Sequence, residues 1–201
     1  MTWGTITLLR HGETAWSKSG QHTGRTEVPL TAEGEQAARA VAPYLPRDPA
    51  LVLCSPLERA QRTAQLAGLT VTRTDPDLLE WDYGAWEGCT TAQIRQELGK
   101  PAWTIWDEPI PPGQTPGEQL SDIRVRTARV IQACLPVLAR GEQCVLVAHG
   151  HVLRILAATW LGLEPIAGRL LALDPATIST LGHEHEQQVI CTWNAGVPVT
   201  Q

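Results

Sequence analysis

The 201-residue sequence contains no phenylalanine, and its eight tryptophans and two tyrosines bring the aromatic content to only 5%. That content is too low to indicate an aromatic platform for sugar binding. No window approaches the roughly 18 uninterrupted apolar residues that a membrane-spanning helix needs, and no basic leader precedes an apolar stretch near the first residue. We therefore expect no membrane partner.

The five cysteines form no C-x-x-C pair, and their number is odd. Cys54 and Cys144 lie in apolar runs, where a reduced cysteine packs as a small core residue. A disulfide framework is therefore not expected. Reduced cysteines are typical of a cytoplasmic protein, and this is the location that the sequence predicts.

Basic residues are not in excess, because 16 lysines and arginines stand against 21 aspartates and glutamates, for a net charge of −5. The signs are interspersed, so no basic stripe indicates a nucleic acid or anionic lipid partner. Any anionic ligand must be bound by a local positive cluster. No repeat divides the chain, and a chain of this length can bury about 70% of its unfolded surface. We expect a single domain over residues 1–201.

Strand-like apolar runs alternate with helical patterns along the chain. Strands are predicted at 5–10, 51–54, near Val71, at 144–148, 178–181 and 189–193. Helices are predicted from Thr31 to before Pro46, from Ser55 to Gly68, from Thr90 or Thr91 to Gly99, from Glu118 to Ala139 with a bend at Pro136, and from Gly150 to Leu161. This alternation predicts an α/β fold, a three-layer sandwich with a mainly parallel central sheet and an antiparallel edge formed by the last two strands.

Two local predictions concern the chain around prolines. Ser55 is predicted to cap a helix, with Pro56 at the first helical position and Glu58 completing a capping box. The segment from Pro101 to Gly117 contains five prolines and is predicted to be a surface loop.

Three of the predicted strands end in residues that can carry chemistry. These ends are Arg10-His11-Gly12, Cys54-Ser55-Pro56 with Arg59 one turn on, and His149-Gly150-His151. In folds of this class ligands bind where parallel strands end and helices begin. The sequence therefore predicts one site at which the three ends converge.

The residues at these ends suit the transfer of a phosphoryl group. A neutral His11 can attack phosphorus, and Arg10 both disfavours the protonated imidazole and binds a phosphate oxygen. Arg59, on the first turn of a helix, and His149 can bind the same anion. Each residue alone has a plainer interpretation, a structural histidine or a solvated arginine, so the hypothesis depends on the set.

A proton donor for the leaving group is predicted in the loop at 79–84. Its carboxylates, Glu80 and Asp82, are bounded by aromatic residues, and partial desolvation suits a carboxyl group to general acid catalysis. Of the two, Glu80 is the predicted acid.

Four motifs together resemble the histidine phosphatase superfamily, whose fold is phosphoglycerate-mutase-like. They are R-H-G-E-T at 10–14, S-P-L-E-R-A at 55–60, E-W-D-Y-G-A-W-E-G at 80–88 and A-H-G-H at 148–151. The resemblance implies that His11 is the phosphohistidine nucleophile, and that Arg10, Arg59 and His149 bind the phosphate. It also implies that Glu80 first protonates the leaving group and then activates water.

The segment at 16–24 resembles the substrate loop of the family, and its sequence is most similar to that of the small acid phosphatase and sedoheptulose-bisphosphatase-like branch. The resemblance implies substrate contacts at Ser17, Thr23 and Gly24, and it implies that Tyr83 lines the pocket. Arg154, one helical turn beyond the H-G-H motif, is a candidate for a second anionic group. An exposed helix arginine is an equally good interpretation of Arg154.

The predicted function is a metal-independent phosphatase that needs no cofactor and hydrolyses small phosphorylated metabolites, with sugar phosphates or bisphosphates as the leading class. The segment at 101–117 is shorter than the corresponding insertion of the phosphoglycerate mutases that the core resembles, and a more open lid favours hydrolysis over mutase activity. A homodimer through sheet edges or helices is a further expectation.

Other functions fit the sequence less well. A phosphoglycerate mutase and a non-catalytic phosphate-binding module stay as alternatives, although the presence of both His11 and Glu80 counts against the module. A metal site on the sequence's histidines lacks carboxylate or cysteine ligands at suitable spacing. Cys89 and Arg95 match the C-x5-R spacing of cysteine phosphatases, but that segment is predicted to start a helix and contains no glycine.

Overall fold

The computed structural model describes residues 3–197, so the ends of the predicted domain, 1–2 and 198–201, lie outside the described residues. Six strands form one sheet in the order β3-β2-β4-β1-β5-β6. The four strands β1, β2, β3 and β4 run parallel to one another, and β5 and β6 add an antiparallel edge. The strands are β1 (Ile6–Arg10), β2 (Leu51–Cys54), β3 (Arg73–Thr74), β4 (Cys144–Ala148), β5 (Ile178–Glu184) and β6 (Gln187–Ala195). The predicted α/β class with a mainly parallel sheet is confirmed.

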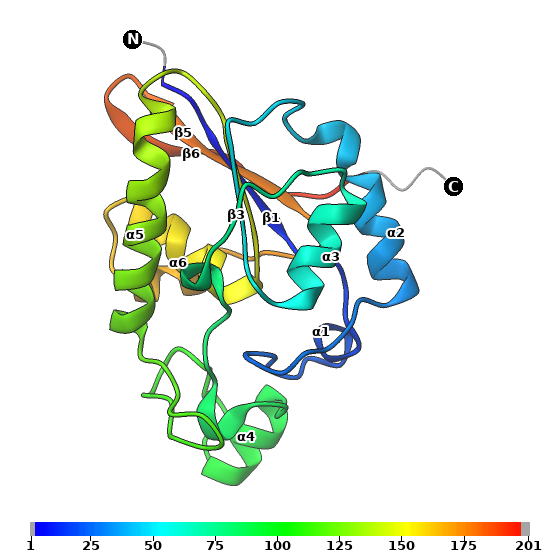
Figure 1. Ribbon diagram of the computed structural model, residues 1–201. Helices are drawn as coiled ribbons and strands as arrows, with labels where there is room; N and C mark the ends of the chain where they lie inside the picture. Colours follow the sequence, from blue (N-terminus) through cyan, green and yellow to red (C-terminus); the bar gives the residue numbers. More distant parts are fainter. Residues whose placement is uncertain (1–2, 198–201) are drawn as a thin grey trace.

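Helices cover both faces of this sheet (Figure 1). α2 and α3 pack together on one face, whereas α5 and α6 pack together on the other. The helices are α1 (Ala15–Ser19), α2 (Ala32–Ala40), α3 (Glu58–Leu66), α4 (Thr91–Leu98), α5 (Leu120–Leu138) and α6 (Gly150–Trp160). Short 3-10 turns occupy Ala42–Tyr44, Pro76–Leu78, Gly84–Trp86 and Pro165–Leu170.

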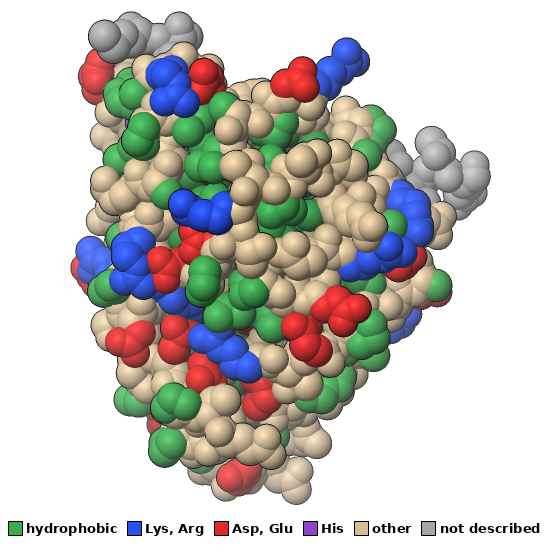
Figure 2. Space-filling model, in the orientation of Figure 1, with side chains coloured by type: hydrophobic (Ala, Val, Ile, Leu, Met, Phe, Trp, Pro, Cys, Tyr) green, Lys and Arg blue, Asp and Glu red, His purple; other side chains and the backbone are tan. Residues whose placement is uncertain are grey.

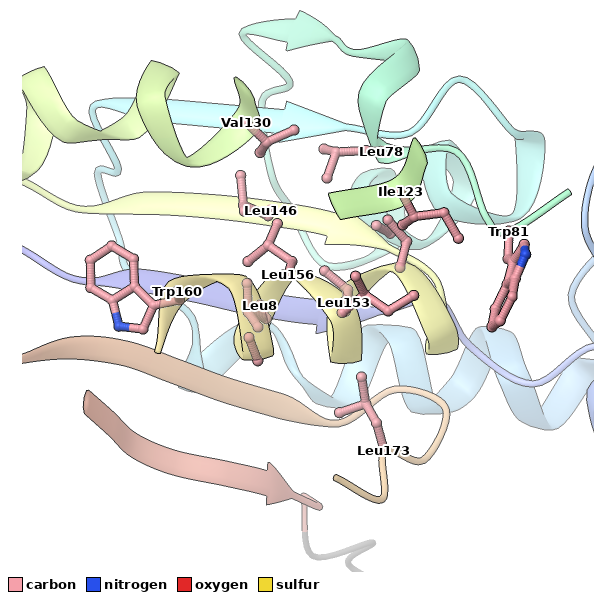
Figure 3. Packing of buried hydrophobic residues seen from close by; sticks show 14 of the residues in the cluster. Leu8, Leu78, Trp81, Ile123, Val130, Leu146, Leu153, Leu156, Trp160 and Leu173 are labelled. Carbon is pink, nitrogen blue, oxygen red and sulfur yellow. The ribbon is translucent and has the colours of Figure 1, made fainter. Parts of the chain in front are cut away.

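The core is divided by the sheet into two clusters. In β4 every residue is buried, and successive side chains alternate between the clusters: Leu146 packs with α5 and α6, whereas Val145 and Val147 join the α3 side. Figure 3 shows Leu8 and Leu146 of the sheet beneath α6. A strand that is covered on both faces must be apolar at every position, which explains its uninterrupted hydrophobic run.

Local signals for two helix starts are confirmed. Thr31 accepts the Gly34 N–H at the start of α2, and Thr90 forms a capping box with Gln93 at the start of α4. α4 ends at Gly99, which has a φ of 65°. The starts of α2 and α4 and the end of α4 all depend on residues within four positions in the sequence, which is why the sequence indicates them correctly.

The predicted cap at Ser55 is wrong. α3 begins only at Glu58, three residues later, and the carboxylate of Glu27 accepts the Glu58 N–H at 3.1 Å. The Ser55 hydroxyl lies 2.7 Å from His149 Nε2 instead. The hydroxyl also accepts the Leu57 N–H at 3.4 Å, but its shorter contact is with a residue at a neighbouring strand end, 94 residues away, and the helix does not begin at Ser55.

Three further elements differ in part from the sequence-based expectation. The short strand predicted near Val71 begins at Arg73, and α1 was not predicted. The segment at 101–117 has no helix or strand, as predicted, but Trp103, Trp106 and Ile110 anchor it in the larger core cluster. No helix among residues 3–197 combines the length and the apolar character required to cross a bilayer.

Candidate active site

The three strand ends named above meet at one edge of the sheet, beside the loop that carries Glu80. A pocket of about 100 Å³ opens there. Its walls are formed by Arg10, His11, Ser17, Gln21, His22, Thr23, Glu80, Tyr83, Gly150, His151, Arg154 and Leu173. Arg59, His149 and Gly24 do not line this pocket, because they lie behind its wall. Seven of the ten predicted site residues therefore face one space, and the other three support it.

His11 is 5% exposed and follows directly on β1. Burial lowers the pKa of its imidazole well below the ordinary value, and the charges of Arg59 and Arg10 lower it further. His11 Nδ1 lies 2.7 Å from the Gly12 carbonyl oxygen. In the neutral ring Nδ1–H donates to that oxygen, which leaves the lone pair of Nε2 free to attack phosphorus.

Gly12 is required by the close approach of two chain segments. A Cβ at this position would lie 2.4 Å from the Gly34 carbonyl oxygen, on α2. The Gly12 N–H also donates to Thr63 Oγ1 at 3.1 Å. The turn after His11 is therefore packed between α2 and α3, and any larger residue would displace His11.

Arg10 forms part of the wall beside His11. Its guanidinium donates to the Leu173 carbonyl oxygen and packs against Gly150, where a Cβ would lie 3.3 Å from Arg10 Cζ. Burial lowers the pKa of Arg10, and the Glu80 carboxylate opposes that effect. Among the described residues Arg10 Nε has no hydrogen-bond partner, so this buried donor is available to an anion.

Arg59 is fully buried and joins the strand ends to the substrate loop. Its Nε donates to His149 Nδ1 at 3.1 Å. Its two terminal nitrogens donate to the carbonyl oxygens of Thr23, Gly24 and Thr26 at 2.9 to 3.1 Å. These four bonds leave one of the five guanidinium N–H groups for a phosphate oxygen. In this geometry Arg59 mainly holds the loop at 23–26.

His149 is also fully buried, and its ring centroid lies 5.1 Å from that of His11. Burial and the charge of Arg59 lower the pKa of His149 well below its ordinary value. Because Nδ1 accepts from Arg59, Nε2 carries the proton and donates to Ser55 Oγ at 2.7 Å. His149 can donate to a phosphate oxygen only when this bond to Ser55 is exchanged.

The Glu80 carboxylate lies at the N-terminus of α6. Its oxygens accept the backbone N–H groups of Trp81, His151 and Val152 at 2.9 to 3.0 Å. The first amides of a helix have no partner within the helix, and their dipoles complement a negative charge. Asp82 instead accepts from Gly84 and Thr115 and does not line the pocket, so the geometry favours Glu80 over Asp82.

The substrate loop is fixed from two sides. Arg59 binds its carbonyl groups, and the Glu87 carboxylate accepts the N–H groups of Gly24 and Thr26 at 2.9 to 3.0 Å. A Cβ on Gly24 would lie 2.5 Å from the Trp81 carbonyl oxygen. Ser17 Oγ is bound within the capping box of α1.

An aromatic wall closes the opposite side of the pocket. Tyr83 Oη lies 2.6 Å from His151 Nδ1, and the His22 ring centroid lies 4.9 Å from that of Tyr83. Burial raises the pKa of Tyr83 well above its ordinary value, and it lowers the pKa of His22 to about 4. Burial also lowers the pKa of His151 well below its ordinary value, so Tyr83, His22 and His151 are all uncharged at neutral pH.

Arg154 reaches the pocket from α6. Its guanidinium donates to the carbonyl oxygens of Gly168 and Arg169 at 3.0 and 3.1 Å and stacks over the Trp106 ring at 4.8 Å. It is therefore an oriented cation at the pocket rim and not a free surface side chain.

The sequence interpretation missed three pocket residues, Gln21, His22 and Leu173. It also missed two supporting residues, Arg126 and Glu118. His151 was seen only as part of the H-G-H motif. His22 lies inside the segment at 16–24, where the family resemblance was a usable signal, whereas Arg126 and Glu118 lie in no motif. Within residues 3–197, no group of three or more histidine, cysteine, aspartate or glutamate side chains is placed to hold a metal ion.

Comparison with known proteins now assigns the family. The model of the histidine phosphatase superfamily (branch 1) matches residues 6–196. The chain belongs to this superfamily. It is 39% identical to an acid phosphatase of Mycobacterium tuberculosis, over 90% of this chain and 87% of the relative. It is 36% identical to sedoheptulose 1,7-bisphosphatase of Saccharomyces cerevisiae, over 78% of this chain and 67% of the relative.

Among solved structures, the chain is similar to the product of a Mycobacterium tuberculosis open reading frame. The TM-score is 0.89 at 35% sequence identity, over 97% of this chain and 99% of that chain. The predicted superfamily, its phosphatase branch and the phosphoglycerate-mutase-like fold are thereby confirmed.

Proposed function

We propose that this superfamily member is a phosphatase that hydrolyses small phosphate monoesters through a phosphohistidine at His11. The observation that carries the proposal is the pairing, across one pocket, of a neutral His11 whose Nε2 is free with the carboxyl group of Glu80. The phosphatases among its relatives support the same reaction class.

In the first step His11 Nε2 attacks phosphorus as the ester P–O bond breaks, and the bonding pair leaves with the ester oxygen. A protonated Glu80 gives its proton to that oxygen, so the alcohol departs neutral. Arg10, and the remaining N–H of Arg59, stabilise the charge on the equatorial oxygens. His149 is proposed to join them by exchanging its bond to Ser55 for one to phosphate.

In the second step the Glu80 carboxylate takes a proton from water, and the oxygen of that water attacks phosphorus. The P–N bond breaks, its electron pair returns to His11 Nε2, and inorganic phosphate leaves. The products are one alcohol and one phosphate, with both His11 and protonated Glu80 restored. No metal or cofactor takes part in either step.

The substrate class is proposed to be sugar phosphates or bisphosphates. A pocket of about 100 Å³ fits a phosphoryl group with a small organic part. Arg154 at the rim is a suitable partner for a second anionic group, and Ser17, Thr23 and Tyr83 can contact hydroxyl groups. The Gly24 N–H is already bound to Glu87, so Gly24 serves the site by letting the loop approach the Trp81 carbonyl oxygen closely.

The face in Figure 2 shows positive and negative side chains interspersed, with no single-sign patch. A polyanion such as nucleic acid would find no extended basic surface on that face. This distribution supports a small-molecule substrate.

The proposal is tested by phosphate release from a panel of sugar phosphates, bisphosphates, phosphoglycerates and p-nitrophenyl phosphate, with a chelator present. His11→Ala, run in parallel, should reduce turnover by more than about 10³-fold, and brief incubation with ³²P-labelled substrate should label the unmutated protein at His11. Release that needs an added metal ion, or that survives in His11→Ala, would overturn the mechanism. Labelling without release would favour a mutase.

A further inference from the structure

Arg126, in the middle of α5, is a buried cation with no part in the proposed reaction steps. It is 5% exposed. Removing a guanidinium from water is costly unless its N–H groups find partners in the protein. The identity of those partners shows what Arg126 holds.

All five N–H groups of Arg126 are used. Three bonds reach the backbone of the acid-bearing loop, at the carbonyl oxygens of Asp77 (2.8 Å), Leu79 (2.6 Å) and Glu80 itself (3.2 Å). The other two reach the Glu118 carboxylate, from Nε at 2.8 Å and from Nη2 at 3.1 Å. A planar fork on a 19-residue helix therefore fixes the backbone from which Glu80 projects.

Glu118 holds the same loop on its other side. Its carboxylate accepts the Asp82 N–H at 3.1 Å, and its backbone carbonyl accepts Trp81 Nε1 at 2.8 Å. Arg25, from the substrate loop, donates to the same carboxylate at 3.2 Å. Glu118 thus joins the acid-bearing loop, α5 and the substrate loop at a single, partly buried carboxylate.

Glu80 is consequently fixed at both ends by two helices that pack against each other. The N-terminus of α6 binds its carboxylate, and Arg126 of α5 binds its backbone carbonyl. α5 and α6 are in contact and share the larger core cluster, to which Ile123 and Leu153 belong (Figure 3). The loop at 79–83 itself has no helix or strand to fix its direction.

We propose that Arg126 and Glu118 are positioning residues for proton transfer by Glu80, and that they set the orientation of its carboxyl group toward the leaving-group oxygen. The inference rests on the proposed role of Glu80. A small rotation of the loop would leave His11 and the phosphate contacts intact but would move the proton donor. Losses of on the order of 10- to 100-fold follow when a reacting group is misplaced by about 1 Å.

The test is the leaving-group dependence of kcat/KM in Arg126→Lys, because kcat/KM reports phosphorylation of His11 and not the later hydrolysis that all substrates share. Lysine keeps the charge but cannot reproduce five N–H groups in a planar fork. We expect kcat/KM for an alkyl phosphate to fall on the order of 10- to 100-fold, with a smaller fall for p-nitrophenyl phosphate, whose anion leaves without a proton. KM should change little, because the phosphate contacts remain.

Three comparisons make the test specific. Arg129→Lys alters an arginine of the same helix that binds only the side chain of Asp77, and it should leave both rates unchanged. Glu118→Gln removes one charge at nearly constant shape and should show the same selectivity. It replaces Arg126→Lys as the test if circular dichroism shows that Arg126→Lys does not fold. With Glu80→Gln already present, Arg126→Lys should cause no further selective loss.

The outcomes separate the two proposals. If Glu80→Gln lowers kcat/KM equally for both substrates, Glu80 is not the acid and the positioning role falls with it. Another outcome is that Glu80→Gln lowers the rate selectively for the alkyl phosphate while Arg126→Lys and Glu118→Gln lower the rates for the two substrates equally, or not at all. In that case Arg126 and Glu118 have only a structural role. An additive selective loss in the double variant would also overturn the positioning role.

Discussion

The two halves of the pocket are built in different ways. Arg10 is the last residue of β1, and His11 and His149 directly follow β1 and β4. The His11 N–H donates to the Ala148 carbonyl oxygen, so the strand pairing itself holds His11. The substrate loop and the acid-bearing loop have no such ladder and are held by long-range side-chain bonds from Arg59, Glu87 and Arg126. The half that we propose receives the phosphoryl group is thus fixed by regular structure, and the half proposed to meet the rest of the substrate is fixed by ionic side chains.

Arg59 should show the largest effect, because it belongs to both halves. Arg59→Lys keeps a charge but loses the fork that binds His149 and three carbonyl groups of the loop. We expect kcat/KM to fall on the order of 10²-fold, with weaker binding of vanadate, measured by inhibition. Arg62→Lys is the matched control, since Arg62 lies on the same helix in a surface pair with Glu35. Equal kinetics in the two variants would refute the role of Arg59.

Glu87 should affect the loop half alone. Glu87→Gln leaves one oxygen to accept the N–H groups of Gly24 and Thr26 and removes the charge that strengthens those bonds. We expect KM for a sugar phosphate to rise about tenfold, the effect of one charge-assisted bond, with kcat changed much less. Glu97→Gln, on the exposed side of α4, is the control. A fall in kcat at constant KM would show that the two halves are not separable in this way.

The smallest effect concerns the pH dependence of stability. The unfolded chain protonates a histidine near pH 6.5, whereas burial lowers the pKa of folded His22 to about 4. The unfolded state therefore binds more protons between these values, and the contribution to stability is present above pH 6.5 and is lost as pH falls. His11, His149 and His151 act in the same direction.

His22→Gln should reduce the loss of unfolding free energy between pH 7.5 and 5.5 by about 1 kcal/mol, measured by urea denaturation. His185→Gln, at an exposed turn, should leave the loss unchanged. An identical pH dependence in the His22 variant and the unmutated protein would mean that His22 is not buried in its neutral form.

The half on the strand ends was largely predictable from sequence, because strand runs, the glycine after His11 and the H-G-H motif are local signals. The loop half was predictable only through resemblance to a family. The cap assigned to Ser55 was wrong, since His149 competes for its hydroxyl group. Arg126 gave no signal, because a helical arginine with apolar neighbours has the same local pattern whether it is exposed or buried.

The α/β class, the parallel core strands and the chemical groups at the strand ends can be read from the chain alone, since each follows from periodicity or from residues adjacent in the sequence. Which groups face the pocket and which lie behind it depends on the tertiary structure. It alone paired Arg126 with carbonyl groups 46 to 49 residues away and Glu80 with the start of α6. Such partners are determined by how the helices pack on the sheet, and no local sequence pattern encodes contacts between residues so far apart in the chain.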